Sequence, residues 1–433
     1  MIHDLHFLAA QRKHLNGEWA EAEILYREVV QSGQNAAQAR HYLGFLLLQM
    51  GRLEDAREQL RQAIALDCGH AEWHFNLGIV HSRLGELDEA VEAHARAVAL
   101  DPNQYFFWTN LGAAHDATGD AVNAEASFNR AILIEPSCPD AYFLMSALLL
   151  KEERFAEGHR FNCLGIVAAP VQCASRIVLS QAYHELGRTA EAIDVLLQWE
   201  REEPDNPIPT HLLAAHQAEA GKAPEQCAPG YVERTFNDFA DRFDDVLARL
   251  EYAGPQLVGN WLAAQDLPPA SQCILDLGCG TGLIGQVLRP RAARLVGVDL
   301  SEAMLQKARD RHCYDVLHRA DIMAFLLKQD EHFDLIACMD VLPYLGSLDD
   351  LMVLIGQSLK PGGLLIFCTE KLASARDGRF RLNVSGRYRH CEDYLRAVLD
   401  GAGFAIELIQ DVVIRNESGC PVVGQFVCAR RTE

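Results

Sequence analysis

The chain has 433 residues, of which 39 are basic and 60 acidic, so its formal net charge at pH 7 is −21. This length corresponds to two or three folded domains at about 100–200 residues each. The acidic balance argues against a broad nucleic-acid surface, because binding to a phosphate backbone depends on Lys and Arg side chains. No run of about 18 apolar residues occurs, so no membrane-spanning helix is predicted.

Thirteen cysteines are scattered along the chain without a Cys-x-x-Cys pair. Such spacing is typical of reduced thiols, and the first residues show no basic segment followed by an apolar run, so we expect a cytoplasmic protein. His70 and His74 stand four residues apart on one face of a predicted helix. No carboxylate or cysteine partner accompanies them at ligand spacing, and we therefore expect no metal site.

Small residues recur every 34 residues in the first half of the chain. One column of this repeat is glycine, with Glu153 in the place of one member, and it comprises Gly17, Gly51, Gly85, Gly119 and Gly187. A second column comprises Ala22, Ala56, Ala90, Ala124, Gly158 and Ala192, and a third comprises Pro102, Pro136, Pro170 and Pro204. Small residues let two helices pack closely, glycine turns the chain between them, and proline ends the second helix. The period therefore predicts a solenoid of helix pairs.

These columns closely resemble the tetratricopeptide repeat (TPR) family, with about six repeats from residue 3 to residue 206 and a partial helix after them. The resemblance implies an α-solenoid over residues 1–222 whose concave groove binds a peptide or protein. In this register the groove would carry Gln38, His41, Phe45, Glu72, Phe75, Ile79, Arg83, Phe106, Thr109 and Asp116. The alternative is a solenoid that only dimerises or braces the second domain.

The periodicity fades before a Pro- and Gly-rich segment at 223–230, which we interpret as a linker to a second domain at 231–433. Short apolar runs then alternate with helical stretches, which predicts a doubly wound parallel sheet. The predicted strands lie at 272–277, 294–299, 333–338, 363–369, 404–413 and 422–430. A turn-rich segment without a helix joins the last two, so the final strand should be antiparallel.

A glycine-rich loop follows the first of these strands, with the sequence Asp276-Leu277-Gly278-Cys279-Gly280-Thr281-Gly282-Leu283-Ile284-Gly285. Such a loop lets the backbone approach a cofactor at the carboxyl ends of the strands. It contains the dinucleotide fingerprint G-x-G-x-x-G, which makes a nicotinamide cofactor one candidate. Asp299, at the end of the second strand, could accept hydrogen bonds from ribose hydroxyls in either class of cofactor.

Three features favour a cofactor without a pyrophosphate. Asp276 precedes the glycines, where a carboxylate would bind an amino group and repel a pyrophosphate. Asp321 is placed to reach an adenine edge, and a final strand pair without a helix is unlike the halves of a dehydrogenase. With Gly-Val-Asp-Leu-Ser at 297–301 and Leu-Lys-Pro-Gly-Gly at 359–363, these motifs resemble class I S-adenosylmethionine (SAM)-dependent methyltransferases over roughly residues 230–431.

The whole chain resembles bacterial predicted methyltransferases with N-terminal TPR repeats. The resemblance implies a Rossmann-like domain with a mostly parallel, seven-stranded sheet and SAM as cofactor. Around the methionyl part of the cofactor it places Asp276, Gly278, Cys279, Gly280 and Gly282. It implies that Asp299 accepts from the ribose hydroxyls beside Leu300, and that Asp321 and Ile322 contact the adenine. Met339 and Asp340 end the fourth strand, where the transferred methyl group should point.

Two segments are candidates for the acceptor pocket. The helical stretch 231–244 carries Phe236, Phe239 and Phe243 on one face, and related enzymes use such a helix as a lid; plain packing is the alternative. The segment 371–396 has seven basic and three acidic residues. In it, Arg387 could clamp a carboxylate or phosphate, and Tyr388 or His390 could act as a base, unless the segment is only a solvated loop.

The sequence therefore favours a SAM-dependent methyltransferase, transferring to oxygen or nitrogen, whose TPR domain recruits or shapes the substrate. That substrate would be a peptide, a protein, a carrier-bound group or an anionic small molecule. A TPR adaptor with a non-catalytic SAM-binding module is an alternative from another class, although the intact Asp276, loop glycines and Asp299 argue against decay. A nicotinamide oxidoreductase is supported only by the literal fingerprint.

Overall fold

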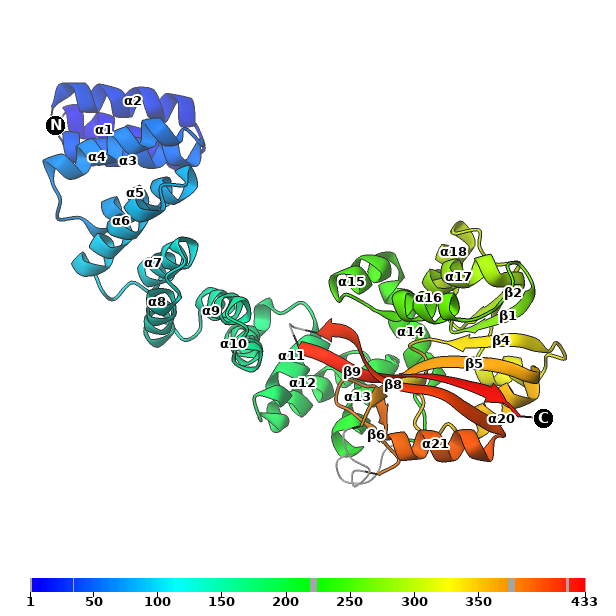
Figure 1. The fold of residues 1–433 in the computed structure, drawn as a ribbon. Coiled ribbons are helices and arrows are strands. Elements are labelled where there is room, and N and C mark those ends of the chain that lie inside the picture. Colours follow the sequence, from blue (N-terminus) through cyan, green and yellow to red (C-terminus); the bar gives the residue numbers. More distant parts are fainter. Residues whose placement is uncertain (1, 34, 219–223, 373–377, 418–419, 433) are drawn as a thin grey trace. The chain divides into compact units, whose positions relative to one another are not determined.

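The structure is a computed structural model that describes residues 2–33, 35–218, 224–372, 378–417 and 420–432 (Figure 1). The chain divides into two compact units, Met1–Ala174 and Ser175–Glu433. The first unit is helical, and the second contains three further helices of the same kind followed by a large sheet.

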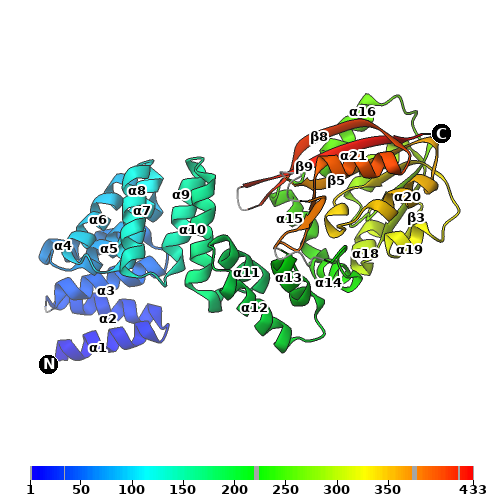
Figure 2. The same ribbon diagram turned by 90° about the horizontal axis from the view of Figure 1, so that it is seen from below.

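Ten helices of nearly equal length form the first unit, and consecutive helices pack as pairs (Figure 2). They are α1 (Ile2–Leu15), α2 (Trp19–Ser32), α3 (Ala36–Gln49), α4 (Leu53–Leu66), α5 (Ala71–Leu84), α6 (Leu87–Leu100), α7 (Tyr105–Thr118), α8 (Ala121–Ile134), α9 (Pro139–Lys151) and α10 (Phe155–Ala168). A short 3-10 turn, η1 (Pro170–Gln172), follows them.

The conserved spacing of small residues has the structural role that the period predicts. Gly85 and Gly119 turn the chain between paired helices with φ angles of 77° and 82°, a region that favours glycine. Glu153 takes the same place in its repeat and adopts a φ of 60°. A Cβ atom at Gly112 would lie 2.6 Å from a ring carbon of Phe128, so the absence of a side chain there permits close packing of the paired helices. The predicted helical solenoid is confirmed.

Three more helices continue the repeat pattern but belong to the second compact unit: α11 (Arg176–Glu185), α12 (Thr189–Glu202) and α13 (Pro207–Ala218). Leu212 of α13 shares an apolar cluster with Tyr231 and Tyr388 of the sheet-containing part. The compact units therefore divide earlier than the predicted boundary at 222–231. Residue 223 of the predicted linker lies outside the described residues, and Gln226 forms an isolated β-bridge with Leu345.

Nine strands form one sheet among the described residues, with the order β3-β2-β1-β4-β5-β7-β6 and with β9 pairing β5 and β8. They are β1 (Gln272–Leu277), β2 (Ala292–Asp299), β3 (Val316–Arg319), β4 (Phe333–Cys338), β5 (Leu359–Lys371), β6 (Phe380–Leu382), β7 (Tyr388–His390), β8 (Phe404–Glu417) and β9 (Cys420–Arg431). Strands β1 to β5 pair in parallel, and β9 is antiparallel to β5 and β8 as predicted. The short hairpin β6–β7 is an addition to the predicted seven strands.

Helices cover both faces of this sheet, so its central strands are apolar on both sides (Figures 1 and 2). Helices α16 and α17 pack on one face, and α20 and α21 on the other. The helices of this part are α14 (Pro229–Phe239), α15 (Phe243–Arg249), α16 (Gly254–Ala264), α17 (Leu283–Leu288), α18 (Glu302–Asp310), α19 (Ile322–Leu326), α20 (Asp349–Ser358) and α21 (Glu392–Gly401), with 3-10 turns η2 (Ala240–Arg242), η3 (Arg289–Arg291) and η4 (Leu342–Tyr344). No described helix combines the length and apolar composition that a membrane crossing requires.

Candidate functional site

The glycine loop lies between β1 and α17, at the carboxyl ends of the parallel strands. Gly278, Gly280 and Gly282 have φ angles of 69°, 53° and 91°, which side chains rarely adopt. A Cβ atom at Gly278 would lie 2.1 Å from Val341 Cγ2, whereas one at Gly280 would meet nothing closer than 4.0 Å. The loop thus presents bare backbone toward the space above the sheet.

Asp299 closes this loop from the end of β2. Its Oδ2 accepts a hydrogen bond from the Gly280 backbone N–H at 2.9 Å, and its Oδ1 accepts one from Ser301 at 2.8 Å. Burial raises the pKa of this carboxyl, and the two backbone donors oppose that shift. Each oxygen retains lone pairs that could accept from a ligand hydroxyl.

Asp321 lies after β3 and caps α19. Its Oδ1 accepts from the Ala324 backbone N–H at 3.0 Å, which satisfies one of the free donors at a helix start. It also lines the same cavity as Asp299, together with Leu300 and Ile322. The capping role and the predicted adenine contact are therefore compatible.

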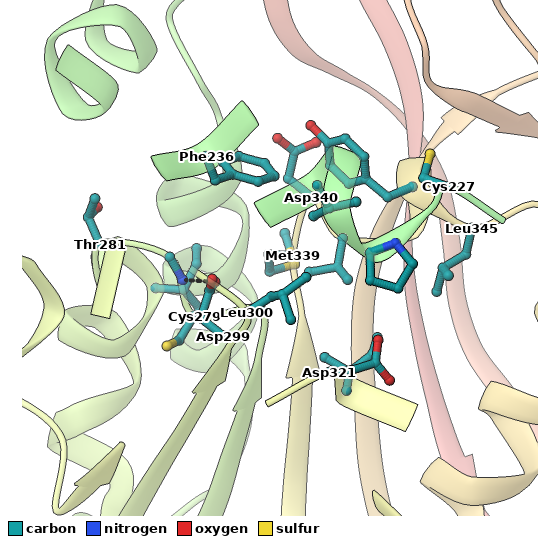
Figure 3. Close-up of a pocket in the computed structure, with 18 of the residues that line it drawn as sticks. Cys227, Phe236, Cys279, Thr281, Asp299, Leu300, Asp321, Met339, Asp340 and Leu345 are labelled. Carbon is teal, nitrogen blue, oxygen red and sulfur yellow. Dashed lines mark hydrogen bonds between the residues drawn. The ribbon is translucent and has the colours of Figure 1, made fainter. Parts of the chain in front are cut away.

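A single cavity connects these strand ends (Figure 3). Besides the loop, it is lined mainly by apolar and aromatic side chains, and the described lining contains no Lys, Arg or His. Its charged residues are Asp299, Asp321 and Asp340. Eight of the ten predicted cofactor residues line it: Gly278, Cys279, Gly280, Asp299, Leu300, Asp321, Ile322 and Met339. The cavity is therefore electronegative and apolar, and it lies where the sequence predicts a cofactor.

The predicted lid covers this cavity, but it is not one helix. It comprises α14, the turn η2 and α15, and Phe236 and Phe243 line the cavity while Phe239 does not. The Phe239 ring instead packs edge-on against Phe243, with centroids 5.6 Å apart. Phe239 is thus placed behind the cavity wall.

Hydrogen bonds attach the lid to the strand ends. Ser301 donates to the Asn237 side chain at 2.6 Å, and Thr281 donates to Asp244 at 2.6 Å. Arg311 pairs with Asp244 and also donates to the Thr281 carbonyl. These bonds therefore connect the glycine loop to the lid.

Two predicted cofactor residues do not line the cavity. Gly282 is the N-cap residue of α17, and its missing side chain leaves room for Arg311 and Tyr314. Asp276 is 1% exposed and accepts a hydrogen bond from the Tyr314 hydroxyl at 2.6 Å. Burial raises the pKa of Asp276 to about 7. In this structure Asp276 supports the loop from beneath rather than facing the cavity.

The structure does not bring the two predicted bases into the cavity. Tyr388 is buried, and its hydroxyl donates to the Pro224 carbonyl at 2.5 Å. His390 is also buried, with its ring nitrogens 2.6 Å from Thr369 Oγ1 and 3.0 Å from the Gly346 carbonyl. Their polar atoms are occupied by internal partners: Tyr388 joins β7 to the segment at Pro224, and His390 joins it to Thr369 of β5 and to Gly346.

The predicted anion clamp is also internally paired. Arg387 Nη1 lies 3.4 Å from Glu370 and 3.6 Å from Glu417, and Arg389 Nε lies 3.5 Å from Glu370. Arg387 does not line the cavity, although Asp340 does. Residues 373–377 of this basic segment lie outside the described residues. The charge excess seen in the sequence is therefore largely neutralised by acids from other strands.

Sequence reasoning missed part of the cavity wall. Gln226 and Cys227, from the predicted linker, line it, as do Tyr252, Tyr344 and Leu345. The only sequence signal was their position near strand ends and the lid. Among the described residues, no group of three or more His, Cys, Asp or Glu is arranged to hold a metal ion.

Comparison with known families agrees with both parts of this architecture. Residues 233–409 match the sequence model of a methyltransferase domain. Residues 43–105, 107–138 and 174–198 match models of the tetratricopeptide repeat. The chain carries a methyltransferase domain preceded by TPR repeats. The residues matched to the methyltransferase domain include most of the lid, the glycine loop and all three cavity carboxylates.

Curated relatives match part of this domain. Ubiquinone biosynthesis O-methyltransferase from Pasteurella multocida (strain Pm70) is 31% identical over 123 residues, which are 25% of this chain and 51% of that protein. The protein of the same name from Roseobacter denitrificans (strain ATCC 33942 / OCh 114) is 32% identical over 127 residues, which are 28% and 51%. The chain spans about half the length of these relatives.

Among solved structures, magnesium protoporphyrin IX methyltransferase from Synechocystis PCC 6803 with bound SAM is 20% identical, with a TM-score of 0.38. The match covers 47% of this chain and 97% of that one. A crystal structure of MamA is 23% identical, with a TM-score of 0.36, and the match covers 37% of this chain and 93% of that one.

Proposed function

We propose that this protein is a SAM-dependent methyltransferase, that it transfers the methyl group to an oxygen atom of its acceptor, and that its TPR domain recruits or shapes the substrate. The observation that carries the proposal is the cavity, which combines an open glycine loop with three carboxylates and no basic side chain in its described lining. The methyltransferase domain match and the curated O-methyltransferase relatives support it.

The residues present fit SAM. The cofactor carries a sulfonium and an ammonium group, and carboxylates stabilise positive charge in a partly dry cavity. The Asp299 carboxylate would accept the ribose hydroxyls, and Asp321 and Ile322 would bind the adenine. When bound there, SAM would supply an activated methyl group, and the task of the protein would be to align the acceptor and exclude water.

The same lining argues against a nicotinamide dinucleotide. A pyrophosphate requires backbone or basic donors and is repelled by carboxylates. The glycine loop could offer backbone donors to a pyrophosphate, but the Gly280 N–H already donates to Asp299. The literal G-x-G-x-x-G fingerprint is therefore explained by loop geometry that both cofactor classes share.

The proposal for the TPR domain rests on its repeats and on the resemblance of such solenoids to peptide-binding scaffolds. A peptide, protein or carrier-bound acceptor would use both parts of the chain, whereas a free metabolite would need only the methyltransferase domain. An anionic acceptor finds no basic partner in the described cavity lining, which makes it the weakest of the four predicted classes.

Calorimetric titration with SAM, S-adenosylhomocysteine (SAH) and NADH tests the cofactor assignment. We expect micromolar affinity for SAM and SAH and no measurable binding of NADH. In Asp299→Ala we expect SAH affinity to fall at least tenfold, because the ribose hydroxyls lose a charged acceptor. NADH binding, or unchanged SAH affinity in Asp299→Ala, would refute the assignment. SAH binding without transfer to any acceptor would instead indicate an adaptor.

A further inference from the structure

Asp340 is a cavity carboxylate that the cofactor assignment does not use. It follows β4 directly after Met339, and it has a φ of 58°, which is uncommon for a residue with a side chain. In Figure 3, Phe236 and Asp340 lie on one side of Met339, and Cys279 and Asp299 lie on the other. Asp340 therefore faces the part of the cavity that lies beyond the loop and Asp299.

One oxygen of the Asp340 carboxylate lacks a hydrogen-bond partner among the described residues. This oxygen is Oδ1, and it is buried. Arg415 Nη1 lies 3.7 Å from this oxygen, and among the described residues it also has no hydrogen-bond partner. Because burying a polar atom without a hydrogen-bond partner is unfavourable, such a pair beside a cavity indicates a ligand group that completes it.

Arg415 is fixed from behind. It is 2% exposed, its Nη2 donates to Glu370 at 2.5 Å, and its Nε donates to Glu417 at 2.7 Å. These bonds leave Nη1 directed at Asp340. Two of the three Arg415 nitrogens thus have acidic partners, and the third stabilises the Asp340 carboxylate without satisfying it.

The charged residues around Asp340 determine which acceptor groups can bind next to it. Arg415 and Glu417 face it from β8, Arg387 from the turn just before β7 and Glu370 from β5, with the Tyr344 and Tyr252 hydroxyls nearby. An anionic acceptor would meet the Asp340 carboxylate, and an ammonium would be disfavoured by Arg415 and Arg387 behind it. Apolar walls at Val232, Phe236 and Leu345 complete the space. These surroundings suit an apolar acceptor molecule that carries an uncharged hydrogen-bond donor.

We propose that Asp340 accepts the hydrogen bond and then the proton of an uncharged hydroxyl group on the methyl acceptor, and that Arg415 is the positioning residue for this carboxylate. This inference rests on the proposed SAM-dependent O-methylation. The cofactor supplies the methyl group: its sulfur–carbon bond breaks, sulfur keeps the electron pair, and the acceptor oxygen bonds to the carbon. The hydroxyl proton passes to Asp340 and is released to solvent as the product leaves.

Burial raises the pKa of Asp340, and Arg387 and Arg415 oppose that rise. A carboxylate with a raised pKa is a stronger proton acceptor than an exposed one, and the positive charges of the two arginines favour its ionised form. The walls also exclude water that would otherwise compete for the Asp340 oxygen.

Calorimetry on the full chain saturated with SAH tests this inference without requiring turnover. The probes share one ring: phenol carries a hydroxyl donor, anisole lacks the donor, benzoate is anionic and benzylamine is cationic. We expect phenol to bind at least tenfold more tightly than each of the others, because a site that requires a donor rejects analogues without one. Asp340→Asn should reduce the preference for phenol over anisole to less than threefold.

The variant and its control are matched. Asparagine tolerates a left-handed backbone, so Asp340→Asn should keep its fold and its SAH affinity. Asp334→Asn changes a carboxylate at the opposite end of β4, where Asp334 accepts from Lys360 and the Cys273 backbone, and it should retain the tenfold preference.

Several results would overturn the inference while leaving cofactor binding intact. These are benzoate or benzylamine binding as tightly as phenol, an undiminished phenol preference in Asp340→Asn, or no probe binding to the SAH-loaded protein. Failure of SAH itself to bind would refute the proposed function, and this inference with it.

Discussion

At the residue scale, the strand-end carboxylates that line the cavity differ from the buried histidine of β7. Asp299 and Asp321 use backbone donors and still face the cavity, whereas His390 is fully enclosed. Burial lowers the pKa of His390 to about 4 from an ordinary 6.5. The ring is therefore neutral at neutral pH, accepting from Thr369 and donating to the Gly346 carbonyl.

This enclosure predicts a specific pH dependence of stability. The unfolded chain protonates His390 near pH 6.5, but the folded chain does so only near pH 4. Between these values the unfolded state binds more protons, so acidification destabilises the fold. The titration of His390 should lower the free energy of unfolding by about 2 kcal/mol between pH 7 and pH 5.

Urea unfolding of wild type and His390→Gln at both pH values measures this effect, because other titrating groups cancel in the comparison. We expect the variant to be less stable at pH 7 and to recover about 2 kcal/mol relative to wild type at pH 5. A constant difference between the two proteins would show that His390 takes up protons equally in the folded and the unfolded chain.

Residue roles were predictable where local sequence determines them. Asp299 and Asp321 each follow a strand, and their positions alone place them at the cavity. Tyr388, His390 and Arg387 were predicted at the reacting end, but they do not line the cavity, and their partners, Pro224, Gly346 and Glu370, are distant in sequence. A local excess of basic residues does not reveal which acids will neutralise it.

At the element scale, the glycine loop combines two separate constraints. Gly278 needs both a left-handed φ and free space, since a Cβ would lie 2.1 Å from Val341 Cγ2. Gly362 has a similar φ of 74°, but nothing lies within 4 Å of its Cβ position. A side chain at Gly362 would therefore meet backbone strain alone, whereas one at Gly278 would meet backbone strain and a steric clash.

Alanine substitutions test this difference. Gly362→Ala should cost about 1 kcal/mol of stability through backbone strain alone. Gly278→Ala should cost about 1–3 kcal/mol more and should lower SAH affinity at least tenfold, because the loop must shift away from Val341. Thermal unfolding and calorimetry check both effects. Equal behaviour of the two variants would mean that the loop has room for a side chain.

Most elements were predictable from periodicity, and the exceptions have physical causes. The 34-residue period and the apolar runs defined the helix pairs and the central strands. The three-residue strands β6 and β7 were not predicted, because they are too short to show alternation. The lid was predicted as one helix, but it is interrupted by η2, which moves Phe243 onto α15.

At the scale of the whole molecule, the end of the repeat pattern and the end of the first compact unit do not coincide. Helix α13 buries Ile208, Leu212 and Leu213, and His211 Nε2 lies 3.0 Å from the Gly386 carbonyl of the turn between β6 and β7. The helices α11–α13 are therefore structural parts of the unit that holds the methyltransferase domain.

Two deletions distinguish this arrangement from a simple linker. Removal of residues 1–174 should leave a folded protein with SAH affinity within threefold of wild type. Removal of residues 1–220 should also expose Tyr231 and Tyr388, and it should cost roughly 5 kcal/mol or more, since each buried Leu or Ile contributes about 1.5–3 kcal/mol. Equal stability of the two truncated proteins would contradict the role given to α13.

The shorter deletion also tests recruitment by the solenoid. If the repeats of the first unit present the acceptor, removal of residues 1–174 should abolish methylation of that acceptor while SAH binding is retained. Full methylation by the truncated protein would show that the first unit serves a separate partner.

The most direct test of the central claim is the transfer of a labelled methyl group. Wild-type protein and Asp299→Ala would be incubated with methyl-labelled SAM and a lysate from cells that lack the protein, and label would be counted in protein and small-molecule fractions. We predict label in one fraction with the wild type and at least a tenfold loss with Asp299→Ala. No transfer by the wild type, or equal transfer by the variant, would contradict the account.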